Sequence, residues 1–393
     1  MKYIRLIFNV AWMVWFSEIA SAHEGHSHGQ PLAVSVALDA HGTLWRASVK
    51  DGFVLVDKSP SVSPVVFSNQ HKLNQQAQKI GTDGDARPKM AIAENGNIYV
   101  TWTQALPTPY SGYIWFSRSI DGGKTFSQPS IVHQDRAEIT HRFDALAVSP
   151  SGRIYVAWVD KRDLIAAKKA NQAYDGAAIY YAVSDDAGAS FSEERKVADN
   201  SCECCRIAML ATEQGDAVMM WRHLFDGGVR DHAMAKVSPN KNSIAIHRAS
   251  FGNWKIDACP HHGPAIAKGG DWGYHMAWFD GGDKVGLFYA RMDGQAWVSS
   301  PAKRFGDANS QAGHPALLSD GDQVWLAWKE LTDTASEVKL AKSNDGGRSW
   351  GDSVVIAQTK GKSDYPQLLL KDGQAYLAWN TESIGLVWAK VSQ

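Results

Sequence analysis

The chain has 393 residues, of which 44% are hydrophobic, and its formal net charge at pH 7 is -1. This hydrophobic fraction is enough for a sizeable core, and the balanced charge excludes the basic surface that is typical of nucleic-acid-binding proteins. The 16 Trp, the 34 Gly and the regularly spaced short apolar runs indicate an all-β protein built from repeats.

The N-terminal segment has the pattern of a secretory signal peptide. Lys2 and Arg5 precede an apolar segment at 6–16, which is short for a membrane span, and residues 20–22 read Ala-Ser-Ala, a cleavage pattern. A membrane anchor is the alternative interpretation. We predict a signal peptide at 1–22 and a periplasmic or secreted protein with no membrane span after cleavage. A tail at 23–30 and one folded domain at 31–393 follow. The tail carries His23, His26 and His28.

A similar strand returns at intervals of roughly fifty to sixty residues, a period that is typical of propeller blades. Another apolar strand precedes each copy across a turn, and a third strand follows it. The sequence therefore predicts a single β-propeller of four-stranded antiparallel blades. A weaker first copy at 43–49 brings the count to seven blades, and six is the alternative if this copy completes the last blade. The clearer copies end at Trp102, Trp158, Trp221, Trp278, Trp328 and Trp379.

Three linkers between the third and fourth strands share the pattern S-x-D-x-G-x-[ST]-[FW]. They are SIDGGKTF at 119–126, SDDAGASF at 184–191 and SNDGGRSW at 343–350. The Asp can accept hydrogen bonds from turn amides, and the Gly can supply a positive φ. We predict a structural role for these positions, which are Asp121, Gly123, Asp186, Gly188, Asp345 and Gly347.

This pattern resembles the Asp box, or BNR repeat, of the sialidase superfamily, and the resemblance covers most of the chain after the signal peptide. It implies the propeller fold. It says little about activity, because Asp boxes also occur in propellers that are not enzymes.

Strand direction sorts the loops of a propeller onto two faces. The loops before the first strand of each blade lie on the same face as the loops after the second strand. The Asp boxes lie on the opposite face. The first face surrounds the channel mouth and gathers reactive side chains, so we predict a site there. Its residues before first strands are Arg87, His141, Arg142, Cys204, Cys205, Arg206, Cys259, His261, His262, His314 and Tyr365. Those after second strands include Asp160, Arg222, Asp280, Lys329 and Glu330.

Cys and His are dense in two segments, CECC at 202–205 and CPHH at 259–262. Thiolate and imidazole together suit Cu(I) or Zn(II). We therefore predict metal handling, tolerance or delivery, with copper preferred and zinc as the alternative. A periplasmic protein that gives or receives the metal is the expected partner. The predicted ligands are Cys202, Cys204, Cys205, Cys259, His261, His262, His141, His314, His23, His26 and His28.

Three other interpretations stay open. The four cysteines could form disulfides in an oxidising compartment and join blades four and five. The chain could be a protein-binding scaffold without catalytic activity. The sialidase resemblance implies a glycoside hydrolase, with an arginine triad for the substrate carboxylate, a Tyr nucleophile and an Asp acid/base. No Glu partner for the Tyr is evident, and the Ile of the family's R-I-P motif is missing. The residues that match these roles are Arg87, Arg206, Arg222, Tyr365 and Asp85.

Overall fold

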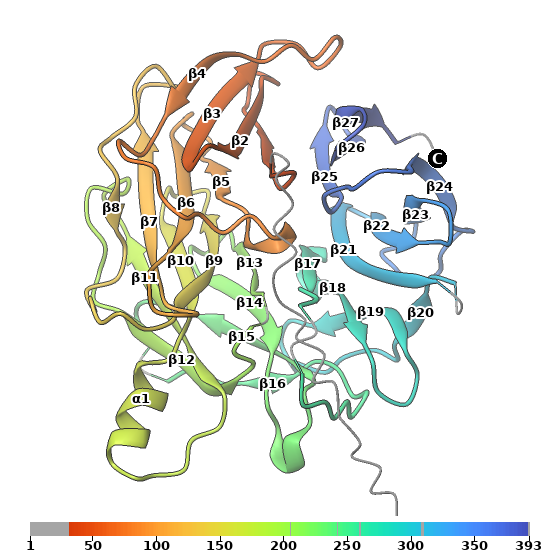
Figure 1. The fold of residues 1–393 in the computed structure, drawn as a ribbon. Helices are drawn as coiled ribbons and strands as arrows, with labels where there is room; N and C mark the ends of the chain where they lie inside the picture. Colours follow the sequence, from red (N-terminus) through yellow and green to blue (C-terminus); the bar gives the residue numbers. More distant parts are fainter. Residues whose placement is uncertain (1–30, 205, 242, 259–260, 308–309, 392–393) are drawn as a thin grey trace, which may run out of the picture. The chain divides into compact units, whose positions relative to one another are not determined.

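The structure is a computed structural model that describes residues 31–204, 206–241, 243–258, 261–307 and 310–391. Within these residues the chain forms seven antiparallel sheets, each built from strands that follow one another in sequence. The first strands of neighbouring sheets contact one another in the middle of a ring (Figure 1). The predicted propeller is confirmed, and it has seven blades rather than six.

The first four blades have four strands each. The strands of blade 1 are β1 (Ser35–Leu38), β2 (Leu44–Lys50), β3 (Phe53–Ser59) and β4 (Ser68–Lys72). Those of blade 2 are β5 (Lys89–Ile92), β6 (Ile98–Ala105), β7 (Gly112–Ser119) and β8 (Ser130–Ile131). Those of blade 3 are β9 (His141–Val148), β10 (Ile154–Asp160), β11 (Ala177–Ser184) and β12 (Arg195–Ser201). Those of blade 4 are β13 (Ala208–Ala211), β14 (Ala217–Arg222), β15 (His232–Val237) and β16 (His247–Arg248).

Blades 5 and 6 repeat this pattern, and blade 7 has three strands in the described part of the chain. The strands of blade 5 are β17 (Ala265–Lys268), β18 (Gly273–Asp280), β19 (Gly286–Asp293) and β20 (Lys303–Phe305). Those of blade 6 are β21 (Gln311–Asp320), β22 (Gln323–Leu331), β23 (Ser336–Ser343) and β24 (Val354–Thr359). Those of blade 7 are β25 (Gln367–Lys371), β26 (Gln374–Thr381) and β27 (Gly385–Lys390).

The second strand of each blade lies at the centre of the core. Every side chain of β10, for example, is buried, because a neighbouring blade covers each face of the sheet. Burial on both faces explains why the repeated strands are almost continuously apolar in sequence. The fully buried indoles of these strands belong to Trp45, Trp102, Trp158, Trp221, Trp328 and Trp379.

A separate apolar cluster fills each of the seven interfaces between neighbouring blades. The interface between blades 7 and 1, called the seam below, has the fewest buried apolar members among the described residues. These members are Val36, Leu44 and Ala378. Polar bonds support the seam: the side-chain amide of Gln367 donates to the Val34 carbonyl at 2.8 Å, and that of Asn380 donates to the Leu32 carbonyl at 2.8 Å.

Each Asp box is a turn closed by its own Ser and Asp side chains. In the first box Asp121 Oδ1 accepts the Ser119 hydroxyl at 2.7 Å and the amides of Lys124 and Thr125 at 3.0 Å. The Ser119 hydroxyl oxygen in turn accepts the amide of Gly123 at 2.8 Å. The second and third boxes make the same type of bonds. The turn therefore satisfies its own polar backbone groups.

The glycine of each box lies directly on an aromatic ring of the preceding blade. A Cβ atom on Gly123 would come within 2.0 Å of the Trp45 ring in β2, and the φ of Gly123 is 76°. Both the close approach and the positive φ require glycine at this position. The equivalent contacts join Gly188 to Phe116 and Gly347 to Tyr289. The boxes thus connect blades 2, 3 and 6 to the blades before them.

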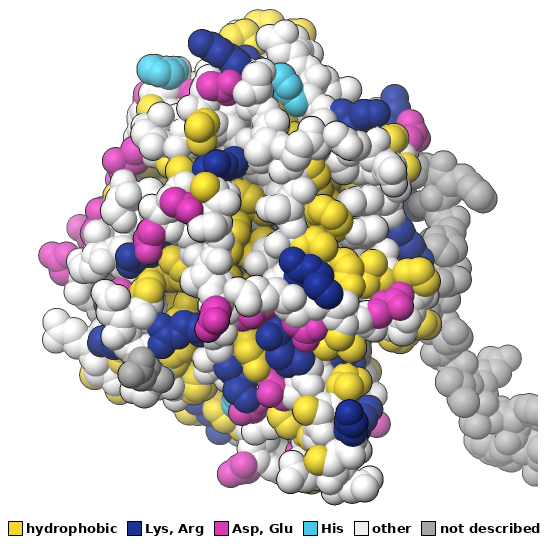
Figure 2. Space-filling view, turned by 90° about the vertical axis from the view of Figure 1, so that its left-hand side faces the viewer, with side chains coloured by type: hydrophobic (Ala, Val, Ile, Leu, Met, Phe, Trp, Pro, Cys, Tyr) yellow, Lys and Arg dark blue, Asp and Glu magenta, His cyan; other side chains and the backbone are white. Residues whose placement is uncertain are grey.

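The loop after β10 contains α1 (Arg162–Lys169), a helix that the sequence analysis did not predict. Short 3-10 turns are η1 (Gly84–Ala86), η2 (Asp226–Gly228) and η3 (Gly270–Trp272). No helix in the described part of the chain is long and apolar enough to cross a membrane. Figure 2 shows acidic and basic side chains interspersed over the face that it displays. The predicted signal peptide and tail, residues 1–30, lie outside the described residues.

His275 in β18 is fully buried beside the third Asp box. Its Nδ1 lies 2.6 Å from the hydroxyl of Tyr289, the residue on which Gly347 packs. Burial lowers the pKa of His275 to about 4, and the positive charge of Arg291 acts in the same direction. The folded protein therefore holds this imidazole neutral.

We predict that Gly123→Ala lowers the free energy of unfolding much more than Gly96→Ala. Both glycines have a positive φ, so both substitutions cost about 1–2 kcal/mol in backbone strain. Only Gly123 faces a ring, whereas no atom lies within 4 Å of a Cβ on Gly96, so overpacking adds about 1–3 kcal/mol to the first variant alone. Denaturant unfolding of both variants measures this difference. Equal losses would contradict the packing role of the box.

We predict that His275 contributes to acid destabilisation. Because its pKa is about 4 in the folded state and 6.5 in an unstructured chain, the unfolded protein binds the proton first, and stability is lost as pH falls from 6.5 towards 4. His275→Gln should reduce the slope of unfolding free energy against pH in this window by about 1.4 kcal/mol per pH unit. The exposed His41→Gln is the control. Unfolding series at several pH values test this, and unchanged slopes for both variants would refute it.

Candidate functional site

Four stacked rings from three consecutive blades lie on the face of the channel mouth. Phe279 of blade 5 stacks on His262 with ring centroids 4.1 Å apart, and His262 stacks on His314 at 4.5 Å. His314 then stacks on Tyr365 at 3.5 Å. Tyr365 also rests on Gly84, where a Cβ atom would come within 2.0 Å of the phenol ring. We call Phe279, His262, His314 and Tyr365 the aromatic column.

The backbone that presents these rings is strained. His261 and His314 have φ values of 53° and 54°, in a region that side chains other than glycine rarely adopt. His314 lies in an irregularity of β21, where the pairing with β22 shifts between Gly313 and Ala316. Phe143 in β9 has a φ of 60° and also lies at a shift in strand pairing. A strained backbone conformation persists only where surrounding contacts stabilise it, and such conformations are frequent at functional sites.

Arg87 and Asp364 form a buried two-point ion pair beside the column. Arg87 Nη1 and Nη2 donate to the two carboxylate oxygens of Asp364 at 2.9 and 2.8 Å. Nη1 also donates to the Val34 carbonyl at 2.7 Å, and Nε donates to the Gly84 carbonyl at 2.8 Å. Burial raises the pKa of Asp364 to about 6, although the charge of Arg87 opposes this shift. The guanidinium thus binds the protein's own carboxylate and links blade 2 to the seam.

Asp85 and His314 pair at the foot of the column. Asp85 Oδ2 lies 3.5 Å from His314 Nδ1. Burial opposes ionisation of Asp85, but the nearby His314 imidazole and the charges of Arg87 and Arg206 hold its pKa below the ordinary value. Burial lowers the pKa of the neighbouring Lys89 to about 8, and its ammonium donates to the Asp85 carbonyl. Acidic and basic groups therefore meet at the channel mouth.

Cys202 and Cys204 hold two sulfur atoms in a buried position. Their Sγ atoms are 3.7 Å apart, and the residues are 1% and 7% exposed. The guanidinium of Arg230 lies 3.7 Å from Cys202 Sγ. Cys205 and Cys259 lie outside the described residues. Within the described ranges, no group of three or more His, Cys, Asp or Glu side chains is arranged to hold a metal ion.

Two arginines hold the segment around Cys204 beside the segment around His261. Arg206 Nη1 donates to the Cys204 carbonyl at 2.6 Å and lies 3.5 Å from His261 Nδ1. Arg230 lies against Cys202 Sγ and also donates to the Ala258 carbonyl at 3.3 Å. The loops of blades 4 and 5 that carry the predicted Cys and His ligands are therefore neighbours.

Two predicted site residues lie elsewhere. His141 is fully buried between blades 2 and 3, where it stacks on His133 at 4.0 Å and its Nδ1 lies 3.1 Å from the Gly112 carbonyl. Arg222 is also fully buried, and it donates to the carbonyls of Arg230 and Phe279 at 2.8 and 2.9 Å. Both side chains point into packed interfaces rather than into the column. A side chain at a strand end near the axis can point either towards the column or into the interface between blades.

Arg230 and Asp364 are site residues that the sequence analysis missed. Arg230 lies in the loop between β14 and β15, and Asp364 directly precedes Tyr365. The rule that assigns loops to faces places both on the channel-mouth face. If this rule is applied to whole loops, and not only to the residues nearest the strands, it identifies both Arg230 and Asp364.

No protein-family model matches the sequence, and no curated protein matches it. Several solved structures share the fold. A Hadza microbial sialidase has a TM-score of 0.50 at 14% identity over 92% of this chain and 74% of its own. A polysaccharide lyase, an ulvan lyase bound to GlcA(1-4)Rha3S, has a TM-score of 0.54 at 12% identity over 93% of both chains. The intramolecular trans-sialidase from Ruminococcus gnavus has 0.52 at 10% identity over 78% and 94%. The chain is thus a sialidase-like propeller in fold.

We predict that Arg87→Ala lowers the free energy of unfolding by about 3–5 kcal/mol, because it leaves the buried Asp364 carboxylate without its cation. The double variant Arg87→Met with Asp364→Leu should lose less than the single variant, since it removes both charges together. Removing the partly exposed pair Arg153 and Asp185 should change stability by less than about 1 kcal/mol. Urea unfolding ranks these variants. A double variant as unstable as Arg87→Ala would contradict the interpretation.

Proposed function

We propose that this protein binds a transition metal at the channel mouth through Cys202 and Cys204 together with ligands from the segment 259–262, and that it handles or delivers this metal. Copper is preferred and zinc is the alternative. The observation that carries the proposal is the 3.7 Å separation of the two sulfur atoms. Two thiolates bound at ~2.3 Å to one tetrahedral ion lie about 3.8 Å apart.

The surroundings of the sulfur atoms fit a thiolate centre. A guanidinium beside Cys202 Sγ favours the thiolate, which is the form that binds metal. A cluster of two or more thiolates around Cu(I) has a net negative charge, which the same guanidinium compensates. Burial at 1% and 7% exposure keeps water away from the sulfur atoms. The preference for copper rests on the soft thiolates and on the His-rich tail.

The neighbouring segment supplies further ligands of the right type. Arg206 contacts the Cys204 carbonyl and the His261 ring, and Arg230 contacts Cys202 Sγ and the Ala258 carbonyl, so the two segments lie side by side. Cys205 and Cys259, which belong to these two segments, are the proposed additional ligands. His23, His26 and His28 of the tail belong to the same proposal as a first contact for metal, in a compartment outside the cytoplasm.

One pairing of the disulfide alternative, that of Cys202 with Cys204, and the hydrolase alternative fit the described geometry less well. The sulfur atoms of Cys202 and Cys204 are farther apart than the ~2.05 Å of a disulfide bond. A sialidase-like hydrolase needs an arginine triad that faces the substrate carboxylate. Arg87 instead binds Asp364, and Arg222 binds backbone carbonyls in the interior. These contacts favour metal binding over glycoside hydrolysis.

The test is metal analysis of full-length, tag-free protein loaded anaerobically with Cu(I) or with Zn(II). Wild type should retain about one ion per chain after desalting, and Cys202→Ser with Cys204→Ser should weaken binding by at least about tenfold. Competition with a chromophoric Cu(I) chelator measures the affinity. His41→Gln with His71→Gln, which removes two histidines of blade 1, is the matched control and should bind as wild type does.

Thermal melts show whether the serine variant is folded, and Cys202→Ala with Cys204→Ala serves if it is not. A metal content that is the same in wild type and in both cysteine variants would overturn the proposal. So would a wild type that retains neither metal. Thiol counting in denaturant separates the disulfide alternative, because thiols that appear only after chelation indicate metal.

A further inference from the structure

A hollow in blade 5 lies on the side of the Asp boxes, away from the channel mouth. The turn before β18 forms one wall, and the end of β19 with the segment between β19 and β20 forms the other. Its volume is about 350 Å³, at the lower end of the range of small-molecule sites. The side chains that give the hollow its chemical character are those of Trp272, Arg291, Asp293, Val298 and Ser299.

The repeat supplies an internal comparison for the arginine of this hollow. Arg118 in β7 and Arg291 in β19 each stand two residues after the ring on which the glycine of an Asp box packs. Arg118 Nη1 donates to the carbonyls of Asp186 and Ala187, two residues of the box that covers it, at 3.2 and 2.6 Å. In that blade, therefore, the fold itself uses the guanidinium.

The third Asp box fills the equivalent acceptor with an arginine of its own. Arg348 stands where the second box has Ala189, and its Nη1 donates to the Asp345 carbonyl at 2.6 Å. Arg291 makes no hydrogen bond or ion pair with any residue that the structure describes. The repeat thus leaves one guanidinium without a structural partner.

Arg291 instead lies on the indole of Trp272, with its Cζ 4.1 Å from the ring centroid. The indole is fixed from two sides. The ring of His275 meets it edge-on at 4.9 Å, and a Cβ atom on Gly269 would come within 2.4 Å of it. Arg291 Nε is enclosed without a hydrogen-bond partner, whereas the two terminal nitrogens are not enclosed. One face of the guanidinium is therefore covered, and its terminal N–H groups are available to a ligand.

The charges around the hollow favour a ligand with a single negative charge. Among the described residues that line it, Arg291 is the one cation. Asp293 lies in the same lining, and its Oδ1 accepts the amides of Gln295 and Ala296 at 2.8 and 2.6 Å. This carboxylate repels a dianion, and no second cation compensates the repulsion. The parallel terminal N–H groups of a guanidinium match the two oxygens of one carboxylate.

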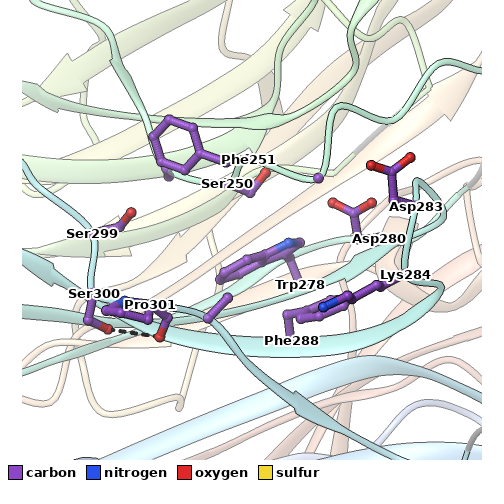
Figure 3. Close-up of a pocket in the computed structure, with 13 residues that line it drawn as sticks. Ser250, Phe251, Trp278, Asp280, Asp283, Lys284, Phe288, Ser299, Ser300 and Pro301 are labelled. Carbon is purple, nitrogen blue, oxygen red and sulfur yellow. Dashed lines mark hydrogen bonds between the residues drawn. The ribbon is translucent and has the colours of Figure 1, made fainter.

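The rest of the wall is apolar, apart from hydroxyls on the segment before β20. Val298 is 64% exposed, and it lines the hollow together with the Trp272 indole. Ser299 and Ser300 also line the larger hollow between blades 4 and 5 (Figure 3). The hydroxyl of Ser300 donates to the Pro301 carbonyl at 3.4 Å, so that of Ser299 is the one available to a ligand.

One class of molecule matches a single guanidinium beside an apolar wall. We propose that this hollow binds a small organic monocarboxylate, with its carboxylate on the terminal nitrogens of Arg291 and its apolar ring or chain against Val298 and Trp272. The bound anion would compensate a half-buried cation that has no counterion within the described part of the chain.

The test uses fluorine NMR titrations of full-length, metal-free protein with 4-fluorobenzoate. Saturable binding is expected. The neutral 4-fluorobenzamide and the cationic 4-fluorobenzylammonium have the same ring without the carboxylate, so each should bind at least about tenfold more weakly. Inorganic phosphate, which has no apolar part and more negative charge, should not displace the benzoate.

Variants locate the binding site. Arg291→Gln should weaken 4-fluorobenzoate binding by at least about tenfold, and it should fold normally because the side chain makes no hydrogen bond or ion pair within the described chain. Arg118→Gln, the matched change in blade 2, should leave binding unchanged. Trp272→Leu removes the indole under the guanidinium and should also weaken binding.

Three results would overturn the proposal. They are the absence of saturable 4-fluorobenzoate binding, equal affinity in wild type and Arg291→Gln, and equal affinity for the benzoate and the benzamide. Displacement by phosphate would contradict the apolar part of the site. Binding should persist in Cys202→Ser with Cys204→Ser, so this result is independent of the metal proposal.

Discussion

The structure depends on how a ring of seven blades is closed. Six interfaces contain substantial apolar clusters, while the seam between blades 7 and 1 has the smallest one. The buried pair of Arg87 and Asp364 compensates there, because it joins blade 2, the segment before β1 and the segment before β25. The same pair organises the channel mouth. Arg87 holds the Gly84 carbonyl, Gly84 supports Tyr365, and Tyr365 carries the rest of the aromatic column. Closure of the ring and the arrangement of the aromatic column therefore depend on the same residues.

Much of this architecture can be read from the sequence, because the constraints that produce it are local or periodic. Strands buried on both faces must be apolar along their whole length, so the copies ending in Trp marked the blades. The weak copy at 43–49 is a full blade, β1 to β4, which settles the count at seven. Strand direction alone assigned His262, His314 and Tyr365 to one face, and these three residues do lie together.

What the sequence did not reveal depends on side-chain direction and on long-range partners. Nothing near Arg87 identifies Asp364, which is 277 residues away. His141 satisfies the same loop rule as His314, yet its ring turns into the interface with blade 2.

The burial of the Arg87 and Asp364 pair has a consequence for the protein's tolerance of its medium. Dissolved ions screen charges that face water, and they screen charges enclosed by protein much less. Exposed contacts such as that of Arg153 with Asp185 weaken as ionic strength rises. The seam is held by charges with side-chain exposures of only 6% and 0%. The ring is therefore closed by an electrostatic contact that dissolved ions screen weakly, so we expect its closure to depend little on ionic strength.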